Sequence, residues 1–107
     1  MNYKNINFEE AWQIINSDSS CVILDVREDF EYATGHASGA VLFPVDDINE
    51  QSAAKVLPDK NAAILIYCRT GNRSREAAEY LSKIGYTNIY DIGSLSGWKY
   101  GLEYGLY

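Results

Sequence analysis

The chain has 107 residues, a formal net charge of −6 at pH 7 and 47% hydrophobic residues, values typical of one folded domain over residues 1–107 and not of a disordered chain. The acidic balance argues against nucleic-acid and membrane partners, and no apolar run approaches the ~18 residues of a membrane span. Two cysteines and one histidine argue against a disulfide framework and a zinc site, and the N-terminus lacks the apolar segment of a secretion signal, so we expect a cytoplasmic protein.

Short apolar runs rich in β-branched residues predict the strands. A weak run lies near residues 3–6, and four stronger runs lie at residues 21–26, 40–43, 63–67 and 88–92. The stronger runs are almost continuously apolar, which is typical of parallel strands that are covered on both faces. Pro44 ends the second of these four runs.

Amphipathic segments between these runs predict helices. We expect a helix that follows Asn7 and reaches Ile15, a short one over residues 28–34, one over residues 46–56, and a final one that Ser74 caps and Gly85 closes. Strands that alternate with helices predict an α/β fold, here an open parallel sheet of four to five strands with helices on both faces, in three layers. No GxGxxG or GxxxxGK[ST] motif follows a strand, which excludes a dinucleotide-binding fold and a P-loop.

The turn between the strand at residues 63–67 and the last helix has the sequence CRTGNR, residues 68–73. Ligands of open parallel sheets bind at the carboxyl ends of the strands, where this turn lies. Gly71 and Asn72 tolerate left-handed backbone conformations, which allow the N–H groups of the turn to point inward as an anion-binding nest. The turn is therefore predicted to bind an anion.

Cys68 stands at the base of this turn. The N-terminus of a following helix and nearby cations, here Arg69, Arg73 and Arg75, stabilise a thiolate. A cysteine activated in this way needs no histidine base. We therefore predict that Cys68 is a nucleophile within an anion-binding loop rather than an inert buried cysteine.

The sequence CRTGNRS at residues 68–74 resembles the active-site loop of rhodanese-like sulfurtransferases. Three other segments resemble motifs of that family in the same order: LDVRE at residues 24–28, GHASGA at residues 35–40, and GSLSGW at residues 93–98. The second segment has Ala37 and Ser38 where isoleucine and proline are commoner in the family, and the third is the least close. The resemblance spans about residues 5 to 100 and implies a single rhodanese-like domain.

The resemblance implies a thiosulfate sulfurtransferase without a metal or an organic cofactor. Cys68 would take the outer sulfur of a small anionic donor such as thiosulfate, become a persulfide, and pass the sulfur to cyanide or another thiophilic acceptor. The substrate-binding residues would be Arg69, Thr70, Gly71, Asn72, Arg73 and Ser74. Their amides would cradle the anion, Arg69 and Arg73 would bind or steer the donor, and Ser74 would hydrogen-bond the sulfur or cap the helix.

Three alternatives remain open. Phosphatases and arsenate reductases with a catalytic cysteine use a Cys-x5-Arg loop, whereas Arg73 stands at Cys-x4-Arg here, and no acid for a leaving group can be named. Cys68 could instead exchange sulfur with a thiol or persulfide carrier protein. The domain could also be a catalytically silent interaction module, although such modules usually lose the cysteine. The sequence leaves the physiological donor and acceptor and the oligomeric state open.

Several residues near these motifs are predicted to be structural. His36 is expected to be a hydrogen-bonded turn anchor, and Arg27 to form an ion pair with Asp25, Glu28 or Glu31. Cys21 is expected to be a small buried hydrophobe rather than a resolving thiol for Cys68. The C-terminal residues 98–107 contain three tyrosines spaced by glycine, and either cover the edge of the sheet or form a patch for a partner protein.

Overall fold

The computed structural model describes residues 3–106, so Met1, Asn2 and Tyr107 of the predicted domain lie outside the described residues. Five parallel strands form one sheet in the order β1-β6-β5-β2-β4. They are β1 (Tyr3–Asn5), β2 (Val22–Asp25), β4 (Val41–Leu42), β5 (Ile64–Cys68) and β6 (Ile89–Ser94). The predicted parallel α/β sheet, including its weak first strand, is confirmed.

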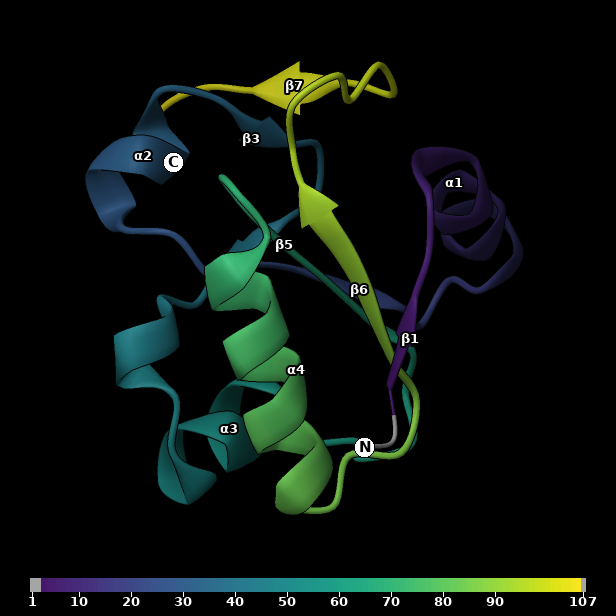
Figure 1. Cartoon of the computed structure of the whole chain (residues 1–107), viewed down its shortest axis with the longest axis vertical. Helices are drawn as coiled ribbons and strands as arrows, with labels where there is room; N and C mark the ends of the chain where they lie inside the picture. The colour runs from purple at the N-terminus through teal and green to yellow at the C-terminus, as the bar shows by residue number, and fades with distance from the viewer. Residues whose placement is uncertain (1–2, 107) are drawn as a thin grey trace.

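Helices cover both faces of this sheet, as Figure 1 shows. Helix α1 (Phe8–Ser17) lies on one face, and α3 (Glu50–Val56) and α4 (Asn72–Lys83) lie on the other. The short helix α2 (Asp29–Ala33) lies beyond the carboxyl ends of the strands. The predicted three-layer arrangement is therefore confirmed. Within residues 3–106, no helix combines the length and the apolar character needed to cross a bilayer.

The central strand β5 is buried along its whole length, which explains its continuous apolar sequence. Its alternate side chains belong to two separate cores. Ile64, Ile66 and Cys68 pack in the core with α3 and α4, whereas Leu65 and Tyr67 pack in the core with α1. This alternation places the sulfur of Cys68 on the same face of the sheet as α4.

The predicted helix over residues 46–56 is wrong, because the structure divides it into a 3-10 turn, η1 (Val45–Asp47), and α3. Asn49 causes the break. Its side chain accepts a hydrogen bond from the Ser52 amide at 2.9 Å, and the Ser52 hydroxyl accepts one from the Asn49 amide at 2.9 Å. Such a capping box requires an extended backbone at the cap, so a continuous helix cannot pass through Asn49.

A second, two-stranded sheet lies above the carboxyl ends of the main strands (Figure 1). In it, β3 (His36–Ala37) pairs antiparallel with β7 (Leu102–Glu103). Both strands have only two residues and lie outside the apolar runs, so the sequence did not predict them. The C-terminal segment therefore pairs with β3, and not with either edge strand of the main sheet.

His36 lies in β3 rather than in the predicted turn. It is buried, its Nδ1 lies 2.9 Å from the carbonyl oxygen of Tyr32, and its ring stacks on the Tyr32 ring. Its Nε2 lies 3.7 Å from a carboxylate oxygen of Glu103 in β7. These contacts are those of a residue that anchors neighbouring segments to one another.

Candidate active site

Cys68 is the last residue of β5 and has no exposed surface. Its Sγ accepts a hydrogen bond from the Gly71 amide, with a nitrogen–sulfur distance of 2.9 Å. The loop carbonyls are held from the side of β6. The Leu95 amide donates to the Cys68 carbonyl at 3.0 Å, and the Ser94 hydroxyl donates to the Arg69 carbonyl at 2.6 Å. The carbonyls of Cys68 and Arg69 are thus bound by Leu95 and Ser94, at the end of β6, while the Gly71 amide is directed to the sulfur.

Helix α4 begins without a side-chain cap, in contrast to α1 and α3, which begin with capping boxes. Its N-cap is Gly71, and its first turn contains no acidic residue. The amides of Asn72, Arg73 and Ser74 donate to no backbone carbonyl in the described part of the chain. These free N–H groups and the positive end of the helix dipole lie next to Cys68 and favour an anion there.

Gly71 and Asn72 both tolerate a left-handed backbone conformation, but only Gly71 adopts it. Gly71 has φ 97°, whereas Asn72 is the first residue of α4. An added side-chain carbon at residue 71 would lie 3.9 Å from the Gly93 Cα, so space is available and the backbone angle is what requires glycine.

The predicted capping role of Ser74 is wrong, because α4 begins two residues earlier, at Asn72. Ser74 is fully buried in the first turn, and its hydroxyl donates to the Gly71 carbonyl at 3.1 Å. The same hydroxyl is therefore directed to the backbone of the turn in this structure rather than to the sulfur. Its position helps to hold the loop closed over Cys68.

The two arginines that were predicted to bind the donor differ in their surroundings. Arg73 forms a bidentate ion pair with Glu31 of α2, with nitrogen–oxygen distances of 2.6 and 2.9 Å. The hydrogen bond from Arg73 lowers the pKa of Glu31 to about 2. Arg69 is exposed and has no carboxylate partner among residues 3–106. Arg69 is thus the loop arginine whose charge is free to meet an incoming anion.

A buried network supports the loop from below. Arg27 donates through Nε to Asp25 at 2.9 Å and through Nη2 to Asp25 at 2.7 Å, and Nη2 also lies 2.7 Å from the Gly35 carbonyl. The predicted ion pair of Arg27 is therefore made with Asp25 and not with Glu28 or Glu31. Burial disfavours the charge of Arg27, but the hydrogen bond and the charge of Asp25 raise its pKa overall.

Tyr67, the residue before Cys68, completes this network and was missed by the sequence reasoning. Its hydroxyl donates to Asp25 at 2.6 Å and accepts a hydrogen bond from the Ala37 amide at 3.1 Å. Burial and the Asp25 carboxylate raise the pKa of Tyr67. The signal in the sequence was a hydroxyl-bearing residue at the end of an otherwise aliphatic strand. Tyr67 links β5 to the end of β2 and to β3.

An open cavity of about 350 Å³ borders the active-site loop. We call it the loop cavity. It is lined by Arg27, Thr34, Gly35, Arg69, Leu95, Ser96, Gly97, Trp98, Leu102 and Tyr104. Two of these residues are cationic and none is acidic, so the cavity is suited to an anion.

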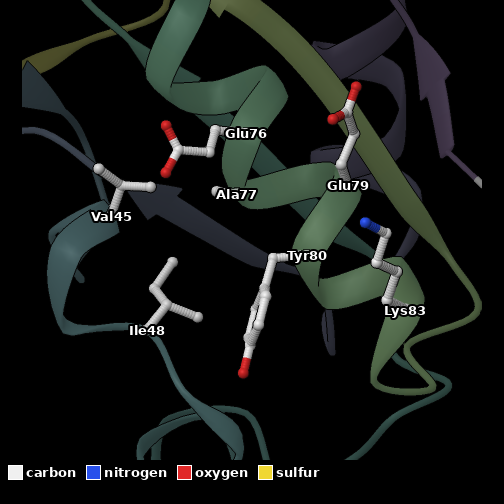
Figure 2. Close-up of a pocket in the computed structure, with 7 residues that line it drawn as sticks. All are labelled: Val45, Ile48, Glu76, Ala77, Glu79, Tyr80 and Lys83. Atoms are coloured by element: carbon white, nitrogen blue, oxygen red, sulfur yellow. The ribbon is translucent and has the colours of Figure 1, made fainter.

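A second groove, of about 240 Å³, lies along the outer side of α4 (Figure 2). Figure 2 shows Val45 and Ile48 facing Tyr80 of α4, with Glu76 and Glu79 on the same helix. No residue of the loop at positions 68–74 lines this groove. Its two carboxylates outnumber its one cation, Lys83, which disfavours an anionic donor. The loop cavity is therefore the better candidate for the substrate.

Both cysteines are unpaired thiols. Cys21 precedes β2 at the amino end of the sheet, whereas Cys68 ends β5 at the opposite end. Cys21 is half-buried rather than fully buried as expected, and burial together with the charge of Asp18 raises its pKa. Its position and its protonated thiol fit a packing residue better than a resolving thiol.

Comparison with known proteins agrees with the motifs. The sequence matches the Rhodanese-like domain family over residues 7–100. It is 39% identical over 72 residues to thiosulfate sulfurtransferase PspE of Escherichia coli (strain K12), covering 67% of this chain and 68% of that protein. It is 32% identical over 100 residues to thiosulfate sulfurtransferase GlpE of Coxiella burnetii (strain RSA 331 / Henzerling II), covering 92% of this chain and 90% of that protein.

A solved structure described as rhodanese with anions from E. coli superposes on this one with a TM-score of 0.73. The two are 33% identical, and the match covers 79% of this chain and 99% of that one. The similarity that the four sequence motifs predict is therefore confirmed by both sequence and structure.

Replacing Glu31 with Gln is expected to remove a pH-dependent part of the stability. The pKa of Glu31 falls from its ordinary 4.5 to about 2 on folding, so its contribution is complete above pH 4.5 and is lost as the pH falls toward 2. Glu31→Gln should lower the free energy of unfolding by roughly 1–2 kcal/mol at pH 7 and flatten its decline below pH 4.5. Urea unfolding at several pH values measures the free energy of unfolding and its decline at low pH. Asp29→Asn, which removes the charge of an exposed neighbouring carboxylate, is the control. Equal pH profiles for wild type and Glu31→Gln would contradict this role.

Replacing Tyr67 with Phe is expected to destabilise the fold at the site. The change leaves the buried Ala37 amide without its acceptor and removes a donor from Asp25. The expected loss is roughly 1–3 kcal/mol in the free energy of unfolding, measured by urea denaturation. Tyr80→Phe, which removes a hydroxyl from an exposed side chain of α4, should change it by less than about 0.5 kcal/mol. A Tyr67→Phe variant as stable as the control would show that the network does not hold the strand ends together.

Proposed function

Because the chain belongs to the rhodanese-like domain family and is a sulfurtransferase, we propose that it moves a sulfane sulfur from thiosulfate, through a persulfide on Cys68, to cyanide or another thiophilic acceptor. One observation supports this proposal above the others. The sulfur of Cys68 lies against the Gly71 amide at the uncapped start of α4. That arrangement stabilises negative charge on Cys68 without a neighbouring base.

In the loading step, the Cys68 thiolate attacks the outer sulfur of thiosulfate. A sulfur–sulfur bond forms to Cys68, the sulfur–sulfur bond of thiosulfate breaks, and its electron pair leaves with sulfite. The outer sulfur then carries the negative charge of the persulfide. The free amides of Asn72, Arg73 and Ser74 follow Cys68 closely in the sequence and can donate hydrogen bonds to this outer sulfur. The exposed Arg69 attracts the thiosulfate dianion.

In the discharge step, the acceptor attacks the outer sulfur of the persulfide. The bond to Cys68 breaks and its electron pair returns to Sγ, so cyanide leaves as thiocyanate. No oxidant or reductant is consumed beyond the donor and acceptor themselves. The amides that stabilise the thiolate before loading also stabilise it as a leaving group.

The donor must gain access to a sulfur that has no exposed surface. Arg69, Thr70 and Asn72 around it are exposed, whereas β5 is buried along its length, so we propose that the loop and not the core moves to admit the donor. The ion pair between Arg73 and Glu31 holds the first turn of α4 to α2. We therefore assign Arg73 to holding the loop and Arg69 to attracting the donor.

Intact-protein mass spectrometry tests the proposed function. Thiosulfate should add one sulfur atom to the reduced wild-type protein, and cyanide should remove it. Cys68→Ser should gain no sulfur, because it lacks the nucleophile. Cys21→Ser is the matched control and should gain and lose sulfur as the wild type does, because Cys21 lies at the other end of the sheet.

The absence of an adduct on folded, reduced wild-type protein would contradict thiosulfate as the donor. An adduct that persists in Cys68→Ser would contradict the assignment of the nucleophile.

A further inference from the structure

The groove along α4, which we call the α4 groove, has apolar walls from two parts of the chain (Figure 2). Val45 and Ile48 form one wall, and Ala77 and Tyr80 of α4 form the other. Ala77 is buried, and Val45 and Ile48 pack against the same core. The Val45 amide also donates to the Val26 carbonyl at 3.0 Å. The walls are therefore held by the core of the domain, and the groove is preformed.

The size of the α4 groove suits one large side chain rather than a small-molecule ligand. Its volume of about 240 Å³ is below the range of ~300–1,000 Å³ in which proteins enclose drug-sized molecules. Tyr80 is 37% exposed and belongs to a residue type that is enriched in protein interfaces. Such interfaces depend on a few large side chains that fill pockets on the partner. The groove is therefore suited to an anchoring side chain of another protein.

The rim of the α4 groove carries more negative than positive charge. Glu76 and Glu79 are its acidic residues, and Lys83 is the one cation that lines it. Glu76 is exposed and forms no ion pair among residues 3–106. Figure 2 shows Lys83 beyond Tyr80, on the side away from Glu76. The charge of Glu76 is thus available to a cationic ligand.

Two further carboxylates extend this acidic rim. Asp46 and Asp47 lie between Val45 and Ile48 in the chain, and both are exposed. Neither forms an ion pair in the part of the chain that the structure describes. The whole chain has a net charge of −6, so a second copy of it, a nucleic acid or an anionic membrane is repelled here. The complementary occupant is a basic segment of another protein.

We infer that the α4 groove binds a basic segment of a partner protein, in which one large apolar side chain is flanked by lysine or arginine. The apolar side chain lies between Tyr80 and the wall formed by Val45 and Ile48. The flanking cations pair with Glu76 and with the carboxylates of η1. No residue of the active-site loop lines the groove, so this binding site is separate from the site of sulfur transfer. The inference does not depend on the proposed function.

Three peptides, each capped at both ends, test the inference. GKRFRKG combines the apolar anchor with cations, GKRSRKG keeps the cations without the anchor, and GEEFEEG keeps the anchor with the opposite charge. Amide chemical shifts, recorded by NMR at low ionic strength, give both the dissociation constant and the location of each peptide. We expect GKRFRKG to bind about tenfold more tightly than GKRSRKG, because a phenylalanine side chain is buried. It should shift the amides of residues 45–48 and 76–83, and GEEFEEG should not bind.

Two variants of the walls test the place of the apolar anchor. Tyr80→Ala and Val45→Thr should each remove most of the preference for GKRFRKG over GKRSRKG, and the use of two variants guards against a folding defect in one. Tyr104→Ala is the matched control. Tyr104 is exposed but does not line the α4 groove, so this variant should keep the preference.

A third variant tests the charge. Glu76→Gln should weaken the binding of GKRFRKG about threefold, which is the effect of one exposed ion pair, and added salt should reduce the difference. Glu9→Gln is the matched control, because it removes an exposed carboxylate from α1 on the opposite face of the sheet. Its effect on the dissociation constant should be smaller than that of Glu76→Gln.

Equal affinities for GKRFRKG and GKRSRKG, or binding of GEEFEEG as tight as that of GKRFRKG, would overturn the inference. A preference that both Tyr80→Ala and Val45→Thr retain, or shifts confined to residues outside the groove, would also overturn it. A dimer of the wild type in light scattering that becomes a monomer in Tyr80→Ala would overturn it in favour of a second copy of this chain.

Discussion

The hydrogen bond from the Gly71 amide to the Cys68 sulfur is the contact on which the site depends. It exists because β5 ends at Cys68 and α4 begins only four residues later, with glycine at the left-handed position between them. The first turn of α4 has no side-chain cap and no acidic residue, so its donors remain available. A cap such as those of α1 and α3 would satisfy these amides and leave the thiolate less stabilised.

Two sets of contacts support this arrangement. Below the loop, Asp25, Arg27 and Tyr67 connect the ends of β2 and β5 to the segment that contains β3. Beside it, Glu31 holds Arg73 of the first turn. Both sets pair their charges, which offsets the cost of taking them out of water. The carboxyl end of the sheet therefore carries a fixed frame, and the exposed Arg69 and the C-terminal segment are the parts that can meet a ligand.

Much of this could be predicted from local sequence. Apolar runs located the five parallel strands, and the pattern at residues 68–74 located the loop that joins β5 to α4 with Cys68 at its base. The break at Asn49 was missed because a capping box interrupts a segment whose apolar spacing alone favours one helix. Ser74 is a good cap by type, but Gly71 adopts the conformation that starts the helix earlier.

The long-range contacts could not be predicted from spacing. Glu31 and Arg73 lie 42 residues apart, as do Asp25 and Tyr67, and only the folded sheet brings each pair together. The pairing of β3 with β7 involves two residues on each side, too few for a period to be visible. As a result the position of the loop was predictable, whereas its supports and the C-terminal wall of the loop cavity were not.

The central claim is that the amides at the start of α4 stabilise charge on the sulfur of Cys68. Amide chemical shifts of residues 69–74, recorded by NMR before thiosulfate, after it, and after cyanide, test this most directly. We predict that the amides of Gly71, Asn72, Arg73 and Ser74 shift when the persulfide forms and return when cyanide removes the sulfur, while those of Phe8 and Glu9 in α1 do not move. A persulfide that forms on Cys68 without any shift of the loop amides would contradict the account.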